Sequence, residues 1–178
     1  MTSPTVRSHA GADPIPGRLL VAVLDSPVGP LTVGVSPDGV VRRALFGDAP
    51  DLVVAGAVAV VAPVDLPGPV AEAVARYGRG ELSALDGVVV GQEGGPFRQA
   101  AWAAMRSIPA GTTVSYTELA AMSGRPTAVR AAASACARNL VAPFVPCHRV
   151  LRSDGTLGGY AYGLDVKRAL LAHEERHS

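Results

Sequence analysis

Cysteine is scarce in this sequence, which limits the kinds of site that the chain can build. Only Cys136 and Cys147 occur among its 178 residues. Two thiols are too few for the disulfide framework of a small secreted domain and too few for a zinc site made of thiolates. We therefore expect no metal site and no disulfide scaffold, and either cysteine can be a free thiol with a chemical role.

Long apolar segments and a secretion signal are also missing. The longest apolar stretch, Leu52–Val64, contains Gly56 and Pro63 and is shorter than the roughly 20 residues that a helix needs to cross a bilayer. Residues 1–17 hold three prolines and scattered polar groups without the apolar centre of a secretion signal. We expect a disordered tail over residues 1–17 and a cytoplasmic protein with no membrane partner.

Charged residues make up only 17% of the chain, and their two signs are unevenly distributed. Residues 1–100 carry seven basic and ten acidic side chains, whereas residues 101–178 carry nine and five. A basic half beside an acidic half suggests an anionic partner for the second half. Because 48% of the residues are hydrophobic, the chain can bury a core as one domain or two small ones.

The first half is predicted to form a small antiparallel sheet with one helix. Apolar runs at Leu19–Leu24 and Val40–Phe46, with alternating apolar residues between them, are typical of strands separated by tight turns. The segment Pro69–Tyr77 begins with proline and has one apolar face, as a helix does. The stretch Leu52–Val64 is ambiguous, and Val88–Val90 could close the sheet.

The second half has the spacing of helices. Apolar residues recur every three or four positions from Pro96 onward. Ser115 and Glu118 have the spacing of a capping box, which predicts a short helix to Ser123. After a break at Gly124, Pro126 is expected to be the first residue of another helix, running to about Ala137. Two helices joined by a glycine-containing turn are typical of the DNA-binding helix-turn-helix.

The second helix of this pair has very small side chains. Two explanations stay open: the helix packs closely in a core, or it must approach another backbone closely while Arg130 is free to probe. Small side chains suit a minor groove about 6 Å wide, and the planar cation of arginine can stack in place of a base. The small residues around Val129 and Arg130 are Ala128, Ala131, Ala132, Ala133, Ser134 and Ala135.

The string Pro146-Cys147-His148-Arg149-Val150 places a thiol next to an imidazole. A free cysteine has a pKa of about 8.5, and an imidazole or positive neighbour favours the nucleophilic thiolate. A helix predicted over Val166–Glu175 carries Glu174, which could orient His148 and complete a nucleophile, base and orienter. The alternative is a buried Cys147 with His148 and Glu174 on the surface. Cys136 is interpreted as a small core residue and His173 as a surface residue.

Taken together, these residues resemble the O6-alkylguanine-DNA alkyltransferases, also called methylated-DNA–protein-cysteine methyltransferases. The resemblance runs from Pro96-Phe97 through the Cys147 string to His173-Glu174, and Leu24–Gly29 is similar to the opening hairpin of that family. It implies an N-terminal ribonuclease-H-like α/β domain over residues 18–91, with an antiparallel sheet plus helix. It also implies a C-terminal winged-helix-like domain with the helix-turn-helix over residues 92–178.

The resemblance also implies roles for residues of this chain. Cys147 would accept the alkyl group, His148 would act as base directly or through water, Glu174 would orient His148, and Asn139 would brace the turn. Tyr116 would crowd a DNA phosphate and donate a proton to the departing guanine, and Arg130 would fill the vacated place in the base stack. The remaining DNA-binding residues would be Ala128, Val129, Ala131 and Ala133, and the pocket would be lined by Val150, Tyr160, Ala161, Tyr162 and Met122.

The expected partner is double-stranded DNA carrying O6-alkylguanine, with O4-alkylthymine as a second candidate substrate. Transfer to a thiol forms a stable thioether, so each molecule would react once and need no cofactor. A monomer is expected, with clustering on DNA left open. Tyr162 departs from the glycine usual in the family, so its bulk could change which alkyl groups fit. Two alternatives remain: an alkyltransferase-like protein that binds lesions without transfer, and a cysteine hydrolase that uses Cys147, His148 and Glu174.

Overall fold

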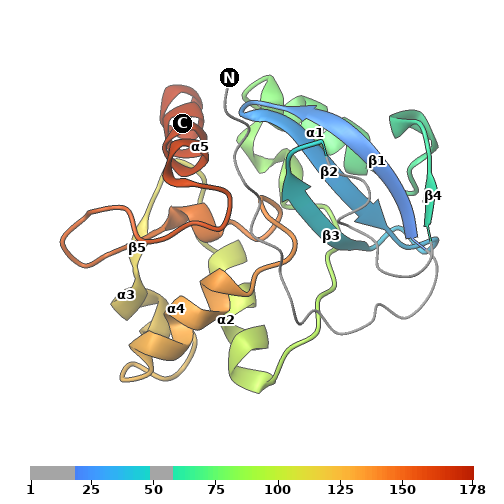
Figure 1. Cartoon of the computed structure of the whole chain (residues 1–178). Coiled ribbons are helices and arrows are strands. Elements are labelled where there is room, and N and C mark those ends of the chain that lie inside the picture. Colours follow the sequence, from blue (N-terminus) through green and yellow to red (C-terminus); the bar gives the residue numbers. More distant parts are fainter. Residues whose placement is uncertain (1–18, 49–57) are drawn as a thin grey trace.

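The computed structural model describes residues 19–48 and 58–178. The tail expected over residues 1–17 and the first part of the ambiguous stretch 52–64 lie outside the described residues. Among the described residues, no helix is both long and apolar enough to cross a membrane. The chain folds into a sheet region followed by a helical region, and Figure 1 shows the two side by side.

The sheet region begins with the predicted meander. Strands β1 (Leu19–Ser26), β2 (Gly29–Val35) and β3 (Val41–Phe46) pair antiparallel in sequence order. The turn between β1 and β2 ends at Gly29, whose φ of 108° is open to glycine but unfavourable for other residues. A short β4 (Val58–Val60) then pairs parallel to β1, so the sheet is mixed and runs β3-β2-β1-β4.

The rest of the sheet region covers and closes the sheet. Helix α1 (Val70–Gly78) packs against the sheet and buries the predicted apolar face, which confirms that helix. Two short 3₁₀ helices, η2 (Pro63–Asp65) and η3 (Leu82–Leu85), flank α1. The segment expected to close the sheet contributes one parallel bridge, between Val90 and Val41, and not a full strand.

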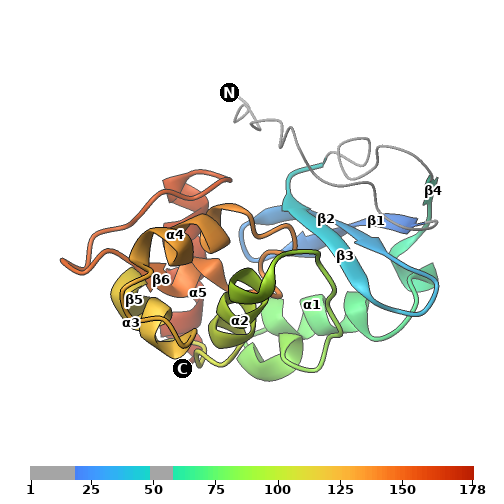
Figure 2. The same cartoon turned by 90° about the horizontal axis from the view of Figure 1, so that it is seen from below.

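The helical region contains α2 (Pro96–Arg106), α3 (Tyr116–Met122) and α4 (Val129–Ala137), with α5 (Leu164–His177) at the end of the chain. Between α4 and α5 lies the 3₁₀ helix η4 (Cys147–Arg149), and the two-residue strands β5 (Val114–Ser115) and β6 (Val150–Leu151) pair parallel. Figure 2 shows α2 on the side nearest to the sheet region, with α3 and α4 beyond it. The predicted combination of an α/β part and a helical part is confirmed.

Of two predictions about the helix-turn-helix, one is confirmed and one is wrong. The predicted capping box is present: Ser115 Oγ accepts from Glu118 N at 3.1 Å, and Glu118 Oε2 accepts from Ser115 N at 2.6 Å. The predicted start of α4 at Pro126 is wrong, because the helix begins at Val129. Residues 124–127 instead form the turn, in which Arg125 N donates to Ala120 O and Ala128 N donates to Arg125 O.

One buried cluster of apolar side chains continues through both regions. It includes Val33 of the sheet, Tyr77 of α1, Trp102 of α2, Leu119 of α3 and Cys147. Backbone bonds also cross between the regions, since Ala44 N of β3 donates to Leu140 O just after α4. The division into domains at residues 91 and 92 therefore stays a prediction, and Cys147 lies on a core that both regions share.

Candidate active site

Cys147 begins the 3₁₀ helix η4, in the chain segment that follows α4, and only 6% of its surface is exposed. Asn139, just beyond the end of α4, donates through Nδ2 to Val145 O at 2.7 Å and to Cys147 Sγ at 3.2 Å. The Asn139 amide is itself fixed, because its Oδ1 accepts from Gln92 Nε2 at 3.1 Å and from Val141 N at 3.2 Å. Asn139 therefore ties the thiol to the turn that presents it.

His148 and Glu174 form a fully buried pair. His148 Nε2 lies 2.8 Å from Glu174 Oε1, and neither side chain has exposed surface. Because a carboxylate can only accept, Nε2 carries the proton and Nδ1 keeps its lone pair. Nδ1 is buried without a hydrogen-bond partner among the described residues. This tautomer is the one that a general base needs, with the free nitrogen available for a proton from a neighbouring group.

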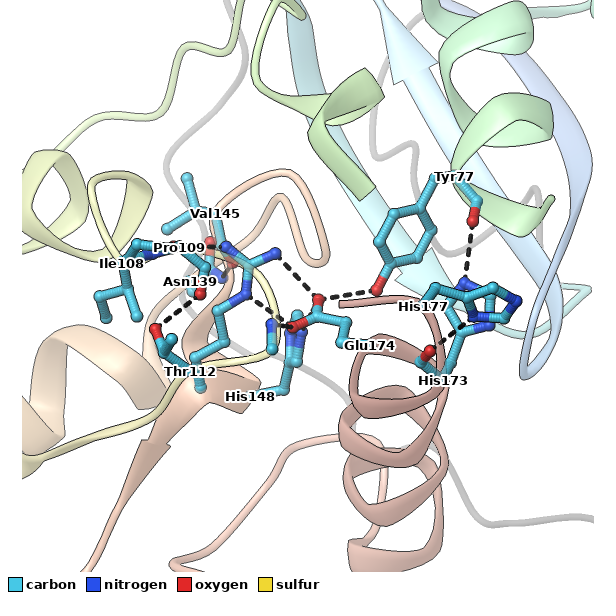
Figure 3. Close-up of polar contacts among 12 residues, drawn as sticks. Tyr77, Ile108, Pro109, Thr112, Asn139, Val145, His148, His173, Glu174 and His177 are labelled. Atoms are coloured by element: carbon cyan, nitrogen blue, oxygen red, sulfur yellow. Dashed lines mark hydrogen bonds and ion pairs between the residues drawn. The ribbon is translucent and has the colours of Figure 1, made fainter. Parts of the chain in front are cut away.

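The Glu174 carboxylate receives more donors than His148 alone. Arg149 donates from Nε to Oε2 and from Nη2 to Oε1, both at 2.9 Å. Tyr77 donates from its hydroxyl to Oε1 at 2.8 Å, and Gly111 N donates to Oε2 at 3.2 Å. Figure 3 shows Tyr77 and His148 approaching Glu174 from different elements of the chain. Burial alone would raise the pKa of Glu174, but the bonds from His148 and Arg149 outweigh it and hold that pKa below its ordinary value of 4.5.

Burial favours the neutral forms of both the Cys147 thiol and the His148 imidazole. Burial raises the pKa of the Cys147 thiol, against the opposing effects of the Asn139 hydrogen bond and the Lys167 charge. Burial likewise lowers the pKa of His148, more strongly than the bond to Glu174 raises it. The expectation that a neighbouring imidazole favours the thiolate stays a prediction, because burial opposes it and is the largest effect on both groups.

Lys167 supplies a positive charge beside the thiol. Its side chain is fully buried in α5, and its Nζ donates to Val150 O at 2.7 Å while lying 5.9 Å from the centre of the Tyr160 ring. Burial lowers the pKa of Lys167, and the Cys147 and Cys136 thiols oppose that shift. A fixed ammonium group near Sγ stabilises the thiolate as it forms.

The loop between β6 and α5 brings two tyrosines beside Cys147. The Tyr160 hydroxyl is buried, and burial, followed by the charge of the nearby Cys147 thiol, raises its pKa; in turn, a contact with this hydroxyl lowers the pKa of Cys147. Tyr162 donates from its hydroxyl to Ala44 O of β3 at 3.1 Å, and its ring stands edge-on to those of Phe46 and Tyr160. Tyr162 therefore ties this loop to the sheet.

Tyr116 begins α3 and faces the same loop. A side chain on Gly158 would collide with the Tyr116 hydroxyl, so this close approach requires glycine at position 158. Burial, followed by the nearby Cys136 and Cys147 thiols, raises the pKa of Tyr116 to about 12. Its hydroxyl therefore stays protonated near neutral pH and can donate a proton or a hydrogen bond.

Helix α4 has a buried face and an exposed face, so close packing in the core accounts for the small side chains of the buried face only. Ala132 and Ala135 are buried, whereas Arg130 and Ala131 are exposed. The other residues predicted to bind DNA, Ala128, Val129 and Ala133, are half-buried. The exposed face of α4 thus presents one long cation among small side chains.

Residues 96–176 match the family described as "6-O-methylguanine DNA methyltransferase, DNA binding domain". The crystal structure of Mycobacterium tuberculosis OGT in complex with DNA is similar over 89% of this chain and 94% of that chain, with 33% sequence identity and a TM-score of 0.73. A second structure, of the M. tuberculosis O6-methylguanine methyltransferase, has 32% identity and the same TM-score, with 90% and 94% covered. The chain belongs to the O6-methylguanine methyltransferase family.

Sequence relatives of the family align with part of this chain. A methylated-DNA–protein-cysteine methyltransferase of Salmonella typhimurium is 43% identical over 108 residues, which are 61% of this chain and 63% of that protein. The bifunctional transcriptional activator and DNA repair enzyme Ada of Escherichia coli is 56% identical over 81 residues, 46% of this chain. The chain spans only 23% of the length of Ada, so the whole activity of that protein is not carried over.

The structure brings most of the predicted site residues of this family member together, with two exceptions. Cys147, His148, Glu174, Asn139 and Tyr116 gather with the predicted pocket residues Val150 and Tyr160, while Ala161 is exposed in the same loop. Met122 ends α3 with 45% of its surface exposed, and no interaction joins it to Cys147 in the described part of the chain. Cys136 is closer to the site, because its thiol affects the pKa values of Tyr116 and Lys167, and the Cys147 thiol helps to raise the pKa of Cys136.

His173 corrects another prediction. It is buried, and its Nε2 donates to Tyr77 O at 2.8 Å, because α5 lies against the end of α1 and covers this face. The residues that the sequence interpretation left without a role are Tyr77, Gln92, Lys167 and Arg149. Arg149 could have been suspected, since it directly follows His148. In the described residues, no group of three His, Cys, Asp or Glu side chains could hold a metal ion.

Proposed function

We propose that this protein repairs alkylated DNA by moving the alkyl group from O6 of guanine onto its own Cys147, once per molecule. The observation that carries the proposal is the buried imidazole of His148, which directly follows the nucleophile in the chain. Its Nε2 is held by Glu174, and its Nδ1 is free to take the thiol proton. The family to which the chain belongs and the soft sulfur nucleophile both support alkyl transfer.

In the proposed reaction, His148 takes the proton of Cys147 directly or through a water molecule. Asn139 and Lys167 stabilise the thiolate, which attacks the alkyl carbon. The sulfur–carbon bond forms as the carbon–oxygen bond breaks, and the electron pair of that bond stays with guanine. Tyr116 donates a proton toward N3 of the leaving base, which neutralises its growing charge. The product thioether has no leaving group that water removes readily, so the protein is consumed. O4-alkylthymine is a second candidate substrate.

The proposed partner is double-stranded DNA bound through the exposed face of α4. An O6-alkyl group lies inside the duplex, so the nucleotide must rotate out, at a cost of a few kcal/mol that is smaller for a poorly paired lesion. The exposed Arg130 would fill the vacated place with its planar cation, and the small Ala131 would allow close approach of the DNA backbone. We further propose a monomer that can cluster along DNA, acting in the cytoplasm; the two free cysteines suit a reducing compartment.

The test is the intact mass of the protein after incubation with duplex DNA that contains O6-methylguanine. We expect a gain of one methylene per chain, mapped to Cys147, with the DNA restored and no further reaction when fresh lesion is added. A lesion-binding protein without transfer would leave both protein and DNA unchanged. A cysteine hydrolase acting on an ester or amide would release product repeatedly, and its recovered chain would be unmodified.

A further inference from the structure

Tyr77 is the only described partner of Glu174 that comes from before residue 96, and so from outside the segment that matches the family's DNA-binding domain. It lies in the last turn of α1, in the sheet region, and 97 residues separate it from Glu174. Its side chain is 1% exposed, so its hydroxyl points into the interior. The sheet region therefore contributes a polar group directly to the candidate active site.

The position of this hydroxyl is closely fixed. Tyr77 Oη donates to Glu174 Oε1 at 2.8 Å, and the same oxygen receives His148 Nε2 at 2.8 Å and Arg149 Nη2 at 2.9 Å. From the other side, His173 Nε2 donates to the Tyr77 carbonyl at 2.8 Å, and the two rings lie 5.1 Å apart. Figure 3 shows Tyr77 between His173 and Glu174. Tyr77 and His148 thus share one carboxylate oxygen.

We propose that Tyr77 is a positioning residue for the alkyl transfer proposed above: acting through Glu174, it fixes the orientation and the proton affinity of His148. The proposal rests on the proposed function for its substrate, but the contact between Tyr77 and Glu174 does not depend on it. By this role the sheet region takes part in the chemistry, in addition to supporting the fold.

The direction of the effect follows from the charges around His148. Burial and the Glu174 charge raise the pKa of Tyr77 far above neutrality, so its hydroxyl is a permanent donor. This donor draws negative charge on Oε1 away from the His148 proton. Without it, Oε1 would hold that proton more strongly and raise the pKa of His148. The other charged groups that act on His148, Arg149 and Lys167, would remain and keep lowering it.

The test is a double-mutant cycle with Tyr77→Phe and His148→Gln in the full chain. His148→Gln removes the base but keeps the pair between Arg149 and Glu174, so the fold is retained. Single-turnover methyl transfer from O6-methylguanine duplex DNA is measured as a function of pH. We expect Tyr77→Phe to slow transfer about tenfold, the factor expected for one buried hydrogen bond to a charged group. We also expect the acid limb of the pH–rate profile of Tyr77→Phe to move to higher pH. In the His148→Gln background, Tyr77→Phe should alter the rate by less than about twofold, because the imidazole through which Tyr77 acts is no longer there.

The matched control is Thr32→Val, which removes another buried hydroxyl of the sheet region, the one that donates to Gly47 O at 2.6 Å. It should lower the melting temperature about as much as Tyr77→Phe without moving the pH profile. Equal slowing by Tyr77→Phe in both backgrounds, or an unmoved acid limb, would overturn the proposal. Alkylation of Cys147 by iodoacetamide, followed by peptide mapping, repeats the cycle without DNA. If the wild-type chain takes no methyl group, the proposed function fails while this second cycle still decides the role of Tyr77.

Discussion

The buried and the exposed parts of the site are built in opposite ways. In the buried part, which we call the back, Glu174 accepts from four different residues, and the side chains of His148, Glu174 and Tyr77 have almost no exposed surface. In the exposed part, which we call the front, Arg130 and Ala131 of α4 face solvent. Groups that must keep one geometry during a reaction benefit from many internal bonds. Groups that must meet a partner need to keep their bonding capacity for that partner.

This difference separates two kinds of defect. A change in the back should slow transfer from every substrate, including a free alkylated base, because it damages the chemistry. A change on the front should slow transfer from duplex DNA only, because a free base needs no extrusion from a stack. The ratio of the duplex rate to the free-base rate therefore assigns each residue to the back or to the front.

The largest effect is expected at the thiol itself. Cys147→Ala should abolish transfer from both substrates while lesion-bearing DNA still binds, as measured by intact mass and by a binding titration. The matched control is Cys136→Ala, because Cys136 is also shielded and burial raises its pKa, but it lacks the Asn139 donor. In that control, the added methylene should still map to Cys147. A methyl group found on the Cys147→Ala chain would refute the assignment of Cys147 as the acceptor.

Glu174→Gln should have the next largest effect. It leaves Arg149 buried opposite a neutral amide, and breaking a buried ion pair typically costs about 3–5 kcal/mol of stability. Transfer from free O6-benzylguanine should fall by about a hundredfold, an order expected when a base loses its orienting group. The folded fraction is measured by circular dichroism at the assay temperature. The exposed neighbour Glu175 supplies the control, since Glu175→Gln should change neither quantity.

The same carboxylate predicts how stability depends on pH. Because the pKa of Glu174 is lowered on folding, its contribution is fully present above the ordinary value of 4.5 and is lost as the pH falls below that value. Urea unfolding of the wild type should therefore weaken more on acidification than unfolding of Glu174→Gln. Parallel curves for the two proteins would mean that Glu174 is not ionised in the folded chain.

Those parts of the site whose signals are local could be predicted from sequence. The capping box of α3, the small side chains of α4 and the Cys147-His148 string are each contained within a few residues. Even here the start of α4 was misplaced by three residues, since Pro126 suits a turn as well as the first position of a helix.

The back of the site could be predicted only in part. The predicted helix makes Glu174 a candidate and the resemblance selects it, but nothing local distinguishes it from the exposed Glu175. Tyr77 looked like one apolar residue in the buried face of α1, and the partner of its hydroxyl is 97 residues away. His173 was assigned to the surface because the sequence does not reveal that α5 packs against α1. Desolvation also opposes the local expectation for the Cys147 thiol, since burial depends on the whole fold.

Arg130→Ala tests the front and should have a smaller effect. We expect repair of duplex lesions to slow about tenfold, within the few kcal/mol that extrusion of a base costs, with transfer from the free base unchanged. Arg130→Lys is the matched control, because it keeps the charge but loses the planar group that can stack. If stacking matters, Arg130→Lys should resemble Arg130→Ala; if charge alone matters, it should resemble the wild type. An equal loss of rate on duplex DNA and on the free base would mean that Arg130 acts on the chemistry and not on extrusion of the base.

The smallest effect is expected at Tyr162, which lies at the border of the back and the front. Its hydroxyl bonds to Ala44 O and its ring contacts Phe46, so it holds the loop against the sheet while its bulk lies near Cys147. Tyr162→Gly should raise the ratio of benzyl to methyl transfer from free bases by about fivefold, since a hydrophobic pocket gains on the order of 1 kcal/mol for each group newly admitted. Tyr162→Phe keeps the ring and loses only the bond to Ala44, so its ratio should stay that of the wild type. If both variants change the ratio equally, attachment of the loop to the sheet sets the selectivity. If neither does, the ring of Tyr162 does not border the alkyl group at all.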